Sequence, residues 1–579
     1  MRYKLYTDKK YETPLEQILY SRGVKDIEKW LKASMKDVSD WDTLDYIEDG
    51  VDLLFKAIQE KNKICIVVDS DVDGYTSAAI LINYLYRVYE DWVKENLIYI
   101  HHKGKEHGLA DVYKEIPEGV SLVICPDGGT NDYDIHEKLN EQGISVLILD
   151  HHEAPHVSKA KNTITINNQL CDYKNKSLSG AGVVWQFCRA FNDILGLEGQ
   201  IDTDLCALGL CADMMDYRNV ETRALVQEGF SNVANPLFYQ MISDNDYIIQ
   251  KHGGLNYRAV AFAVVPFINA TIRSGTQEEK DCIFRAMCLP WAFVKVPFTK
   301  RGHKGEEVSS YIEASYKTAA IKRRQTKLEQ DALTLLDKKV KEENLLDDKV
   351  LMLLCNPGEV EKNIAGLVAN KLQAKYQKPT LVLTKTKTMN EKEYSYRGSI
   401  RNYSMCEIEN FKDILDGTGL TEYVVGHQGA AGCGVKESNI PALKKKLNNI
   451  YQDVSNEAVF WVDYKWTMDE ANQETLLELA DLCEYWGQDI QPSQVFIEDI
   501  DLSQCKKSLC GSKNNVLRMI LPNGLVLVKF GVKEEEFESM LEDNTYLSCV
   551  VTPKRNEWQG IVTGEGEIDS FELNTRWFF

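Results

Sequence analysis

One pattern constrains the fold of this chain more than any other: short apolar runs that end in acidic residues. It occurs at 63–69 (KICIVVD), 120–127 (VSLVICPD) and 144–150 (ISVLILD), and segments with helical spacing of apolar residues follow the first two. Strands that alternate with helices in this way are typical of a parallel sheet covered by helices. The sequence therefore predicts an α/β fold, with the acidic loops at the carboxyl edge of the sheet, where such sheets bind ligands.

The rest of the chain divides by changes in apolar pattern. A charged, periodic stretch without proline or glycine predicts one long connecting helix, a second α/β pattern follows it, and strand-like runs near the C-terminus predict a small β-barrel. We expect a helical lead-in at 1–60, the α/β domain with the acidic loops at 61–312, the connecting helix at 313–345, the second α/β domain at 346–455 and the barrel at 456–579.

The acidic loops contain a candidate metal centre. Carboxylates that converge on one sheet edge cannot all stay ionised without compensation, and divalent cations supply it. Oxygen and imidazole ligands suit Mn²⁺ or Mg²⁺, and two ions about 3.5–4 Å apart can hold the attacking and leaving oxygens of a phosphoryl displacement. The candidate residues are Asp69, Asp71, Asp73, Asp127, Asp150, His151, His152 and Asp213.

Each motif taken alone has a simpler explanation. The DxDxDG segment resembles part of a calcium loop, but the twelfth position of that loop would be Ile80, which has no ligand atom. Asp127 could be a helix N-cap, and His152 a structural histidine. These simpler readings account poorly for all four acidic segments occurring together in this order.

The order of motifs resembles the DHH phosphoesterase family. DxDxDG at 69–74, PDGGTN at 126–131, DHH at 150–152 and GLCAD at 209–213 match its four motifs, and segments at 178–183, 266–273, 398–401 and 426–432 are similar to its RecJ-like members. The sequence departs from the pattern at three places. Val67 stands where many members have histidine, Met214-Met215 follows the fourth motif, and Val425 replaces a glycine.

The resemblance implies roles for individual residues. It implies metal ligands at Asp71, Asp73, Asp127, His151 and Asp213, with Asp69, Asp150 and His152 as catalytic or supporting groups. A helix bearing a basic run would add strand contacts, although a solvated helix face is the default reading of such a run. The expected substrate-binding residues are Arg273, Ser399, Arg401, Gly426, His427, Lys322 and Arg323.

The resemblance also implies the activity: a metal-dependent, single-strand-specific DNA exonuclease that works 5′ to 3′ and releases mononucleotides, with two Mn²⁺ or Mg²⁺ ions. The first alternative is a phosphodiesterase for short oligonucleotides or cyclic dinucleotides. The second is a non-catalytic replication scaffold, which Val67 supports. By analogy with the family, single-stranded DNA is the expected partner, together with a single-strand-binding protein or a helicase.

Charge and composition limit these readings. A net charge of −21 opposes binding of a polyanion, so either a basic groove exists locally or the substrate is not a nucleic acid. The fifteen cysteines are scattered without a CxxC pair, which favours reduced thiols over a zinc site. No apolar run is long enough for a membrane helix and the N-terminus has no signal pattern, so we expect a cytoplasmic protein without membrane contact. We also expect a monomer.

Overall fold

The computed structural model describes residues 1–104, 106–387, 393–403, 405–406, 408, 410–455 and 457–575. Residues 456 and 576–579 of the predicted terminal barrel therefore lie outside the described residues. The chain forms two compact units. Unit 1 comprises 1–18, 323–481 and 492–579, and unit 2 comprises 19–322 and 482–491. The finer five-part division remains a prediction.

Unit 2 is built on a parallel five-stranded sheet, as predicted. Its strand order is β3-β2-β4-β5-β6, and every neighbouring pair is parallel. The acidic segments therefore leave adjacent strands at one edge of the sheet. The strands are β2 (Lys63–Val68), β3 (Leu97–His101), β4 (Val120–Pro126), β5 (Ser145–Asp150) and β6 (Thr163–Asn167).

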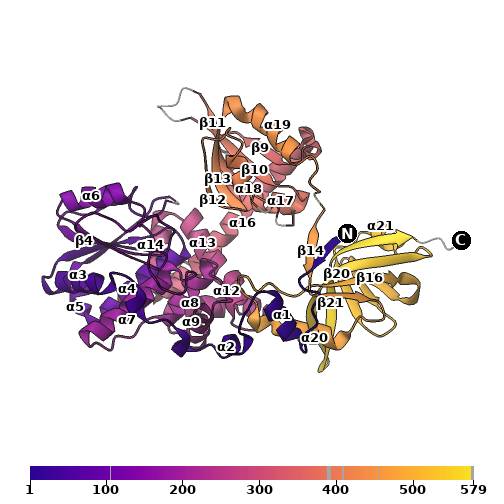
Figure 1. Cartoon of the computed structure of the whole chain (residues 1–579), viewed down its shortest axis with the longest axis horizontal. Coiled ribbons are helices and arrows are strands. Elements are labelled where there is room, and N and C mark those ends of the chain that lie inside the picture. Colours follow the sequence, from indigo (N-terminus) through magenta and orange to yellow (C-terminus); the bar gives the residue numbers. More distant parts are fainter. Residues whose placement is uncertain are drawn as a thin grey trace. The chain divides into compact units, whose positions relative to one another are not determined.

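Helices cover both faces of this sheet. The helix α6 (Tyr133–Glu141) lies on one face, where Ile135 and Leu139 pack against alternate strand residues such as Val67 and Val123. The helices α3 (Ile47–Gln59), α4 (Val72–Val88) and α7 (Gly180–Leu195) lie on the other face (Figure 1). Burial on both faces explains why the strands read as nearly continuous apolar runs.

The remaining elements of unit 2 are mostly short helices. The helix α8 (Thr203–Ala212) packs against α4 and places the fourth acidic segment. The others are α2 (Ile27–Leu31), α5 (Glu90–Asn96), α9 (Val220–Ser231), α10 (Pro236–Asp244), α11 (Asp246–Lys251), α12 (Tyr257–Ala263), α13 (Val265–Ser274), α14 (Gln277–Met287), α15 (Leu289–Ala292) and the hairpin β7 (Lys295–Pro297) with β8 (Glu307–Ser309).

The start of the chain differs from the helical lead-in that we predicted. β1 (Arg2–Leu5) is a strand that pairs in parallel with β14 (Val459–Val462) in unit 1. Its pairing partner lies more than 450 residues away, so local helical spacing could not reveal it. Helices begin only at α1 (Pro14–Ser21).

The predicted connecting helix is present as α16 (Ser310–Glu342), which has 33 residues. Its buried positions recur every three or four residues, from Ala314 through Ile321 to Leu336 and Val340, which is the spacing of one helix face. Leu336 and Val340 pack into the core of unit 1. No helix in the described part of the chain is long and apolar enough to cross a membrane.

Unit 1 contains a mixed five-stranded sheet with the order β12-β13-β11-β10-β9. β9 and β10 are parallel, and the other pairs are antiparallel. One core lies under α16 and α17, and a second lies under α18 and α19. The elements are β9 (Leu351–Cys355), α17 (Ala365–Tyr376), β10 (Thr380–Thr386), β11 (Ser395–Arg401), α18 (Phe411–Asp416), β12 (Tyr423–His427), β13 (Ala430–Lys436) and α19 (Ile440–Ile450).

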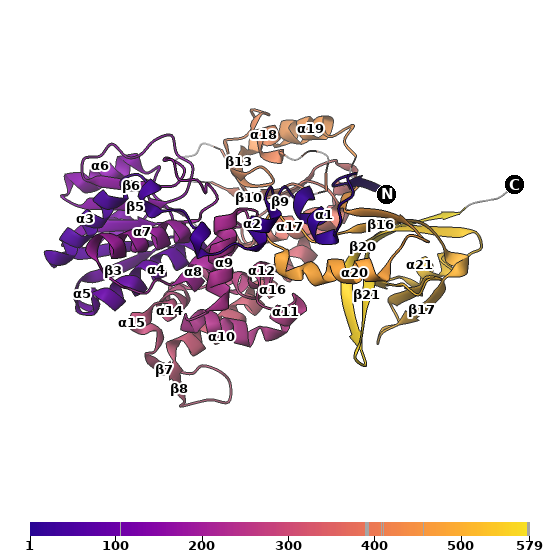
Figure 2. The ribbon, with the colours of Figure 1, turned by 60° about the horizontal axis from the view of Figure 1, so that its bottom comes forward.

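The C-terminal part of unit 1 is a seven-stranded sheet of order β15-β16-β20-β21-β19-β18-β17. The end strands β15 and β17 do not pair with each other among the described residues, so closure of this sheet into a barrel remains a prediction. A long β20–β21 hairpin projects beyond the other strands (Figure 2). The elements are β15 (Tyr464–Thr467), α20 (Gln473–Asp481), β16 (Val495–Asp501), β17 (Lys506–Cys510), β18 (Val516–Ile520), β19 (Val526–Phe530), α21 (Glu534–Ser539), β20 (Thr545–Trp558) and β21 (Ile561–Thr575).

Candidate metal centre

The first acidic segment turns directly from β2 into α4. Asp71 caps the helix, and its side chain accepts a hydrogen bond from Gly74 N at 3.0 Å. Gly74 is required at this turn, because a Cβ there would lie 2.5 Å from the Cβ of Asp69. The tight turn keeps the carboxylates of Asp69, Asp71 and Asp73 together at the sheet edge.

The N-terminus of α7 holds the carboxylate of Asp73. Gly180 N donates to Asp73 Oδ2 at 2.7 Å, and Ser179 Oγ and Ala181 N donate to Oδ1 at 2.9 and 3.2 Å. Free N–H groups at a helix N-terminus stabilise an anion in this way. The glycine-rich segment at 178–183 thus positions a predicted metal ligand.

Asp127 follows β4 in a strained backbone conformation. Its φ is 63°, in the left-handed region that few residues other than glycine adopt. Its backbone N–H donates to Leu149 O at 2.8 Å, which fixes the turn against β5. Its Oδ1 atom is buried and accepts no hydrogen bond from the described residues. Strain of this kind is typical of functional sites.

Asp150 fixes the conformation of the DHH segment through hydrogen bonds to both of its carboxylate oxygens. Its Oδ1 accepts hydrogen bonds from the backbone N–H groups of His151 and His152 at 2.7 and 3.1 Å and lies 2.8 Å from His152 Nδ1. Its Oδ2 accepts from Thr130 Oγ1 at 2.6 Å and from Thr130 N at 3.1 Å. Burial opposes ionisation of Asp150, but these bonds lower its pKa overall, and the Asp150 contact raises the pKa of His152 to about 9.

His151 lies among three carboxylates. Its Nε2 is 3.2 Å from Asp127 Oδ1, 3.5 Å from Asp213 Oδ2 and 4.0 Å from Asp73 Oδ2. Asp213 reaches this position as the C-cap of α8. Burial lowers the pKa of His151, which favours the neutral imidazole that a metal ion needs.

The other carboxylates resist ionisation together. Burial and neighbouring acids raise the pKa of Asp71, raise that of Asp127 well above its usual range, and raise that of Asp213 to about 8. Ligand atoms within 4.8 Å of one another occur in three groups, which are Asp69-Asp71-His107, Asp73-His151-Asp213 and Asp127-Asp150-His151-His152. Oxygen and imidazole donors around clustered charge fit divalent cations of the Mn²⁺ or Mg²⁺ type.

The structure adds residues that we did not predict. His107 contacts Asp69, and His102 lies behind it, with Nε2 3.4 Å from Asp69 Oδ1. A sequence signal existed, because the apolar run of β3 also ends in polar residues, HHKGKEHG, at the same sheet edge. Gly180, within the glycine-rich segment 178–183, is also required, because a Cβ there would lie 2.4 Å from Asp127 Oδ1.

Four predicted substrate-binding residues meet on one sheet of unit 1. The register pairs Arg401 with Ala430 and Ala430 with His427, so their side chains share a face, and Ser399 lies two residues from Arg401 on that face. Gly426 lies on the opposite face with φ 136°, where a Cβ would be 2.7 Å from Ala431 Cα.

The remaining predicted contacts are more scattered. Arg273 is half-buried in the last turn of α13 in unit 2. On α16, Lys322 is half-buried and Arg323 is exposed. Contacts of these three residues with single-stranded DNA remain predictions.

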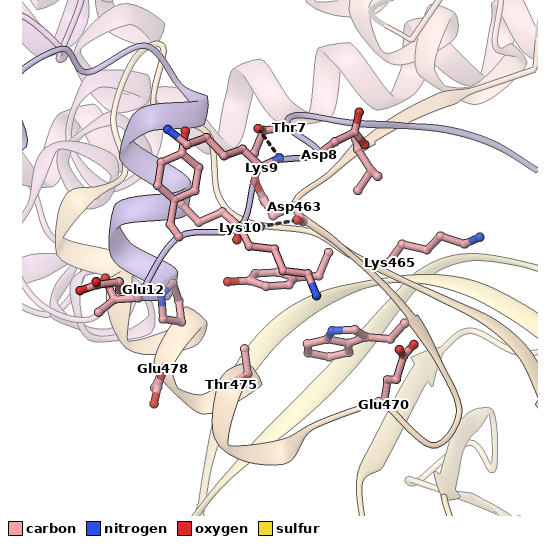
Figure 3. Close-up of a pocket in the computed structure, with 17 residues that line it drawn as sticks. Thr7, Asp8, Lys9, Lys10, Glu12, Asp463, Lys465, Glu470, Thr475 and Glu478 are labelled. Atoms are coloured by element: carbon pink, nitrogen blue, oxygen red, sulfur yellow. Dashed lines mark hydrogen bonds between the residues drawn. The ribbon is translucent and has the colours of Figure 1, made fainter.

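A separate pocket of about 630 Å³ lies in unit 1, lined by 7–14 and by residues around β15 (Figure 3). Gln17 Nε2 donates to Asp463 O at 2.7 Å beside it. Lys10 extends into the pocket, whereas Lys465 pairs with Glu498 at 2.9 Å. Its walls carry charges of both signs, so the pocket is unlike the acidic centre of unit 2.

Comparisons with known proteins follow the same lines. Residues 63–212 match the model of the DHH family, N-terminal domain, and residues 462–569 match that of the RecJ OB domain. The chain is 33% identical to the putative SPbeta prophage-derived single-strand DNA-specific exonuclease YorK of Bacillus subtilis, over 99% of this chain and 98% of YorK. It is 25% identical to the single-stranded-DNA-specific exonuclease RecJ of B. subtilis, over 96% of this chain and 67% of RecJ.

The fold also resembles a solved structure. The crystal structure of RecJ in complex with Mn²⁺ from Thermus thermophilus superimposes with a TM-score of 0.70 at 18% identity, over 96% of this chain and 75% of that protein. At this identity the likeness establishes a shared fold.

Proposed function

The chain belongs to the DHH family, in the RecJ-like branch that includes YorK, and on this premise we propose that it is a metal-dependent exonuclease of single-stranded DNA. It would remove nucleotides from the 5′ end and release mononucleotides. The observation that carries the proposal is the convergence of two carboxylates on one imidazole: Asp127 Oδ1 and Asp213 Oδ2 lie 3.2 and 3.5 Å from His151 Nε2. This centre lies on a chain that is similar to such exonucleases along its whole length.

We infer that two divalent cations, Mn²⁺ or Mg²⁺, bind at this centre. Asp71, Asp73, Asp127, His151 and Asp213 would hold them. Bound there, such ions lower the pKa of water and neutralise charge on the phosphate that is attacked. Asp73 would be oriented by the N-terminus of α7.

Two further residues have positioning or binding roles in this proposal. Asp150 would orient the DHH segment, because both of its oxygens already accept hydrogen bonds. His152 is half-exposed, with its Nδ1 fixed by Asp150, so its Nε2 could donate to a phosphate oxygen.

The mixed sheet of unit 1 would bind the DNA backbone. Ser399, Arg401 and His427 share a face, and the guanidinium of Arg401 lies beside Gly366 in the first turn of α17. An arginine, a hydroxyl and free N–H groups of a helix N-terminus are suited to phosphate. We propose that the seven-stranded sheet at 462–569 grips the strand as an OB-type module, aided by Arg273, Lys322 and Arg323.

The alternative activities make different use of the same centre. A phosphodiesterase for short oligonucleotides would not need the OB domain that residues 462–569 match. A scaffold would not need a complete set of acids. A single-strand-binding protein or helicase as partner, and the cytoplasmic location, remain predictions.

The test uses the wild-type chain and Asp127→Asn with Mn²⁺. Substrates are single-stranded and duplex DNA, each labelled at one end only, and a dinucleotide. We expect early release of labelled mononucleotide from the 5′ end of single strands, and a loss of roughly 10³-fold in the variant, since a metal contribution of several kcal/mol is removed. His156→Ala, which alters an exposed histidine, is the control.

Two results would contradict the proposal. Hydrolysis of the dinucleotide alone would assign the chain to the short-oligonucleotide class. Strand binding without hydrolysis of any substrate would favour the scaffold.

A further inference from the structure

The loop after β3 brings a second imidazole to the acidic edge. His107 Nδ1 contacts Asp69 Oδ2, and one ligand atom from each of Asp69, Asp71 and His107 lies within 4.8 Å of the others. The side chain of His107 is 52% exposed, whereas that of Asp69 is buried. His107 therefore faces both the acid cluster and solvent, as a ligand at the mouth of a site would.

Backbone contacts fasten this loop in place. Gly108 N donates to Asp69 Oδ1 at 3.0 Å, and Leu109 N donates to Asp132 Oδ2 at 2.6 Å. Gly108 has φ 75°, and a Cβ there would lie 2.3 Å from Asp132 Oδ2, so glycine is required. The position of His107 is thus fixed by its neighbours on both the chain and the sheet edge.

A buried histidine supports Asp69 from the other side. His102 Nδ1 lies 2.9 Å from Asp111 Oδ1, and its Nε2 lies 3.4 Å from Asp69 Oδ1 without forming a hydrogen bond to a described residue. Its ring is buried. Asp69 Oδ1 therefore accepts a hydrogen bond from Gly108 N and lies beside the ring of His102, and Asp69 Oδ2 is directed to His107.

Strand β2, which leads into Asp69, offers no imidazole to the group formed by Asp69, Asp71 and His107. Val67, two residues before Asp69 on β2, is fully buried against the apolar residues under α6. His151 belongs to the other groups, with Asp73 and Asp213 or with Asp127 and Asp150.

We propose that His107 is a ligand of one of the two divalent cations, which it holds together with Asp69 and Asp71, while Asp73, Asp127, His151 and Asp213 hold the other. The inference rests on the proposed function only in requiring that cations bind. Asp69 then becomes a ligand, whereas Asp150 remains a positioning residue. His102 acts through Asp69 and is a positioning residue as well.

The test counts manganese sites directly. Mn²⁺ is titrated into the metal-free full-length protein, and free Mn²⁺ is measured from its electron paramagnetic resonance signal. Wild type and His156→Ala are expected to bind two ions. His107→Ala is expected to keep one site unchanged and to weaken the other by at least about 10-fold, the lower end for loss of a supporting group.

Nitrogen coupling to bound Mn²⁺, measured by pulsed paramagnetic resonance, identifies the ligand. His151→Ala should retain coupling from one imidazole, and His151→Ala with His107→Ala should retain none. His107→Asp supplies a ligand oxygen in place of the imidazole. It should therefore preserve two sites, lose the nitrogen coupling from His107 and keep the coupling from His151. This variant also serves if His107→Ala fails to fold, which circular dichroism would detect.

Two ions bound by His107→Ala with wild-type affinity, or nitrogen coupling unchanged in His107→Asp, would overturn the proposal. Because these readouts need no DNA, they separate it from the proposed function. A chain without nuclease activity could still show the site, and an active chain could lack it.

Discussion

Asp127 Oδ1 lies 3.2 Å from His151 Nε2, yet it is buried and accepts no hydrogen bond from any described residue. A buried carboxylate oxygen without a donor is costly, and neighbouring acids increase that cost. The pair is therefore arranged for a third participant with positive charge. We therefore predict that the stability of unit 2 depends on metal ions.

Asp127→Asn should stabilise the metal-free protein but reduce the stabilisation that metal ions provide. In a chelator the variant should unfold at a higher temperature than wild type, because the cost of burying an acid among other acids is removed and asparagine tolerates the left-handed backbone at this position. In Mn²⁺ at about 100 times Kd, wild type should gain about 2.7 kcal/mol per site, and the variant less. Scanning calorimetry with and without Mn²⁺ measures both. Equal responses to Mn²⁺ would contradict a role of Asp127 in metal binding.

Gly180→Ala should weaken metal binding by displacing Asp127. The new Cβ would lie 2.4 Å from Asp127 Oδ1 and 2.5 Å from its Cβ, so the carboxylate cannot move aside by rotation alone. We expect Mn²⁺ affinity and nuclease rate to fall by about 10–100-fold, the range for groups that orient ligands. Gly196→Ala is the control, because its φ of 62° makes the substitution straining while nothing lies within 4 Å. That control should lose stability but keep its affinity for Mn²⁺.

Arg401→Lys should weaken binding of single-stranded DNA although it keeps the charge, because lysine cannot form a bidentate bond to phosphate. In an Asp127→Asn background, the slope of log K against log salt should stay unchanged for lysine and become shallower by about 0.7 for Arg401→Ala. Fluorescence anisotropy at several salt concentrations gives both values. Lys385→Ala is the matched control, since its register places it on the opposite face of the sheet and it pairs with Glu437 at 2.6 Å. An equal loss of DNA affinity in Lys385→Ala would show that net charge, and not a specific phosphate contact of Arg401, determines binding.

His136 should make unit 2 sensitive to acid. Burial lowers the pKa of His136 to about 4, below the value of about 6.5 expected for the unfolded chain. The unfolded state therefore binds more protons between these values, so the stabilisation is complete above pH 6.5 and is lost as pH falls towards 4. Between pH 7 and pH 5, wild type should lose about 2 kcal/mol more than His136→Gln, as urea unfolding in a chelator would measure. Parallel losses in both proteins would show that other groups control the acid response.

Local sequence determined much of the site. Apolar runs that end in Asp69, Asp127 and Asp150 predict strands, and parallel strands must present their carboxyl ends at one edge. The parallel sheet of unit 2 and the long helix α16 follow from periodicity of this kind, because it depends on residues only a few positions apart.

Other contacts depended on tertiary structure, because they join residues far apart in the chain. Strand order puts β3 beside β2, and only then does His107 reach Asp69. Packing of α7 against α4 brings Gly180 to Asp73, and strand register aligns Arg401 with His427 across β13. The pairing of β1 with β14 was likewise beyond local pattern. Sequence spacing specifies which residues leave a strand end together, whereas strand order and register decide which of them meet.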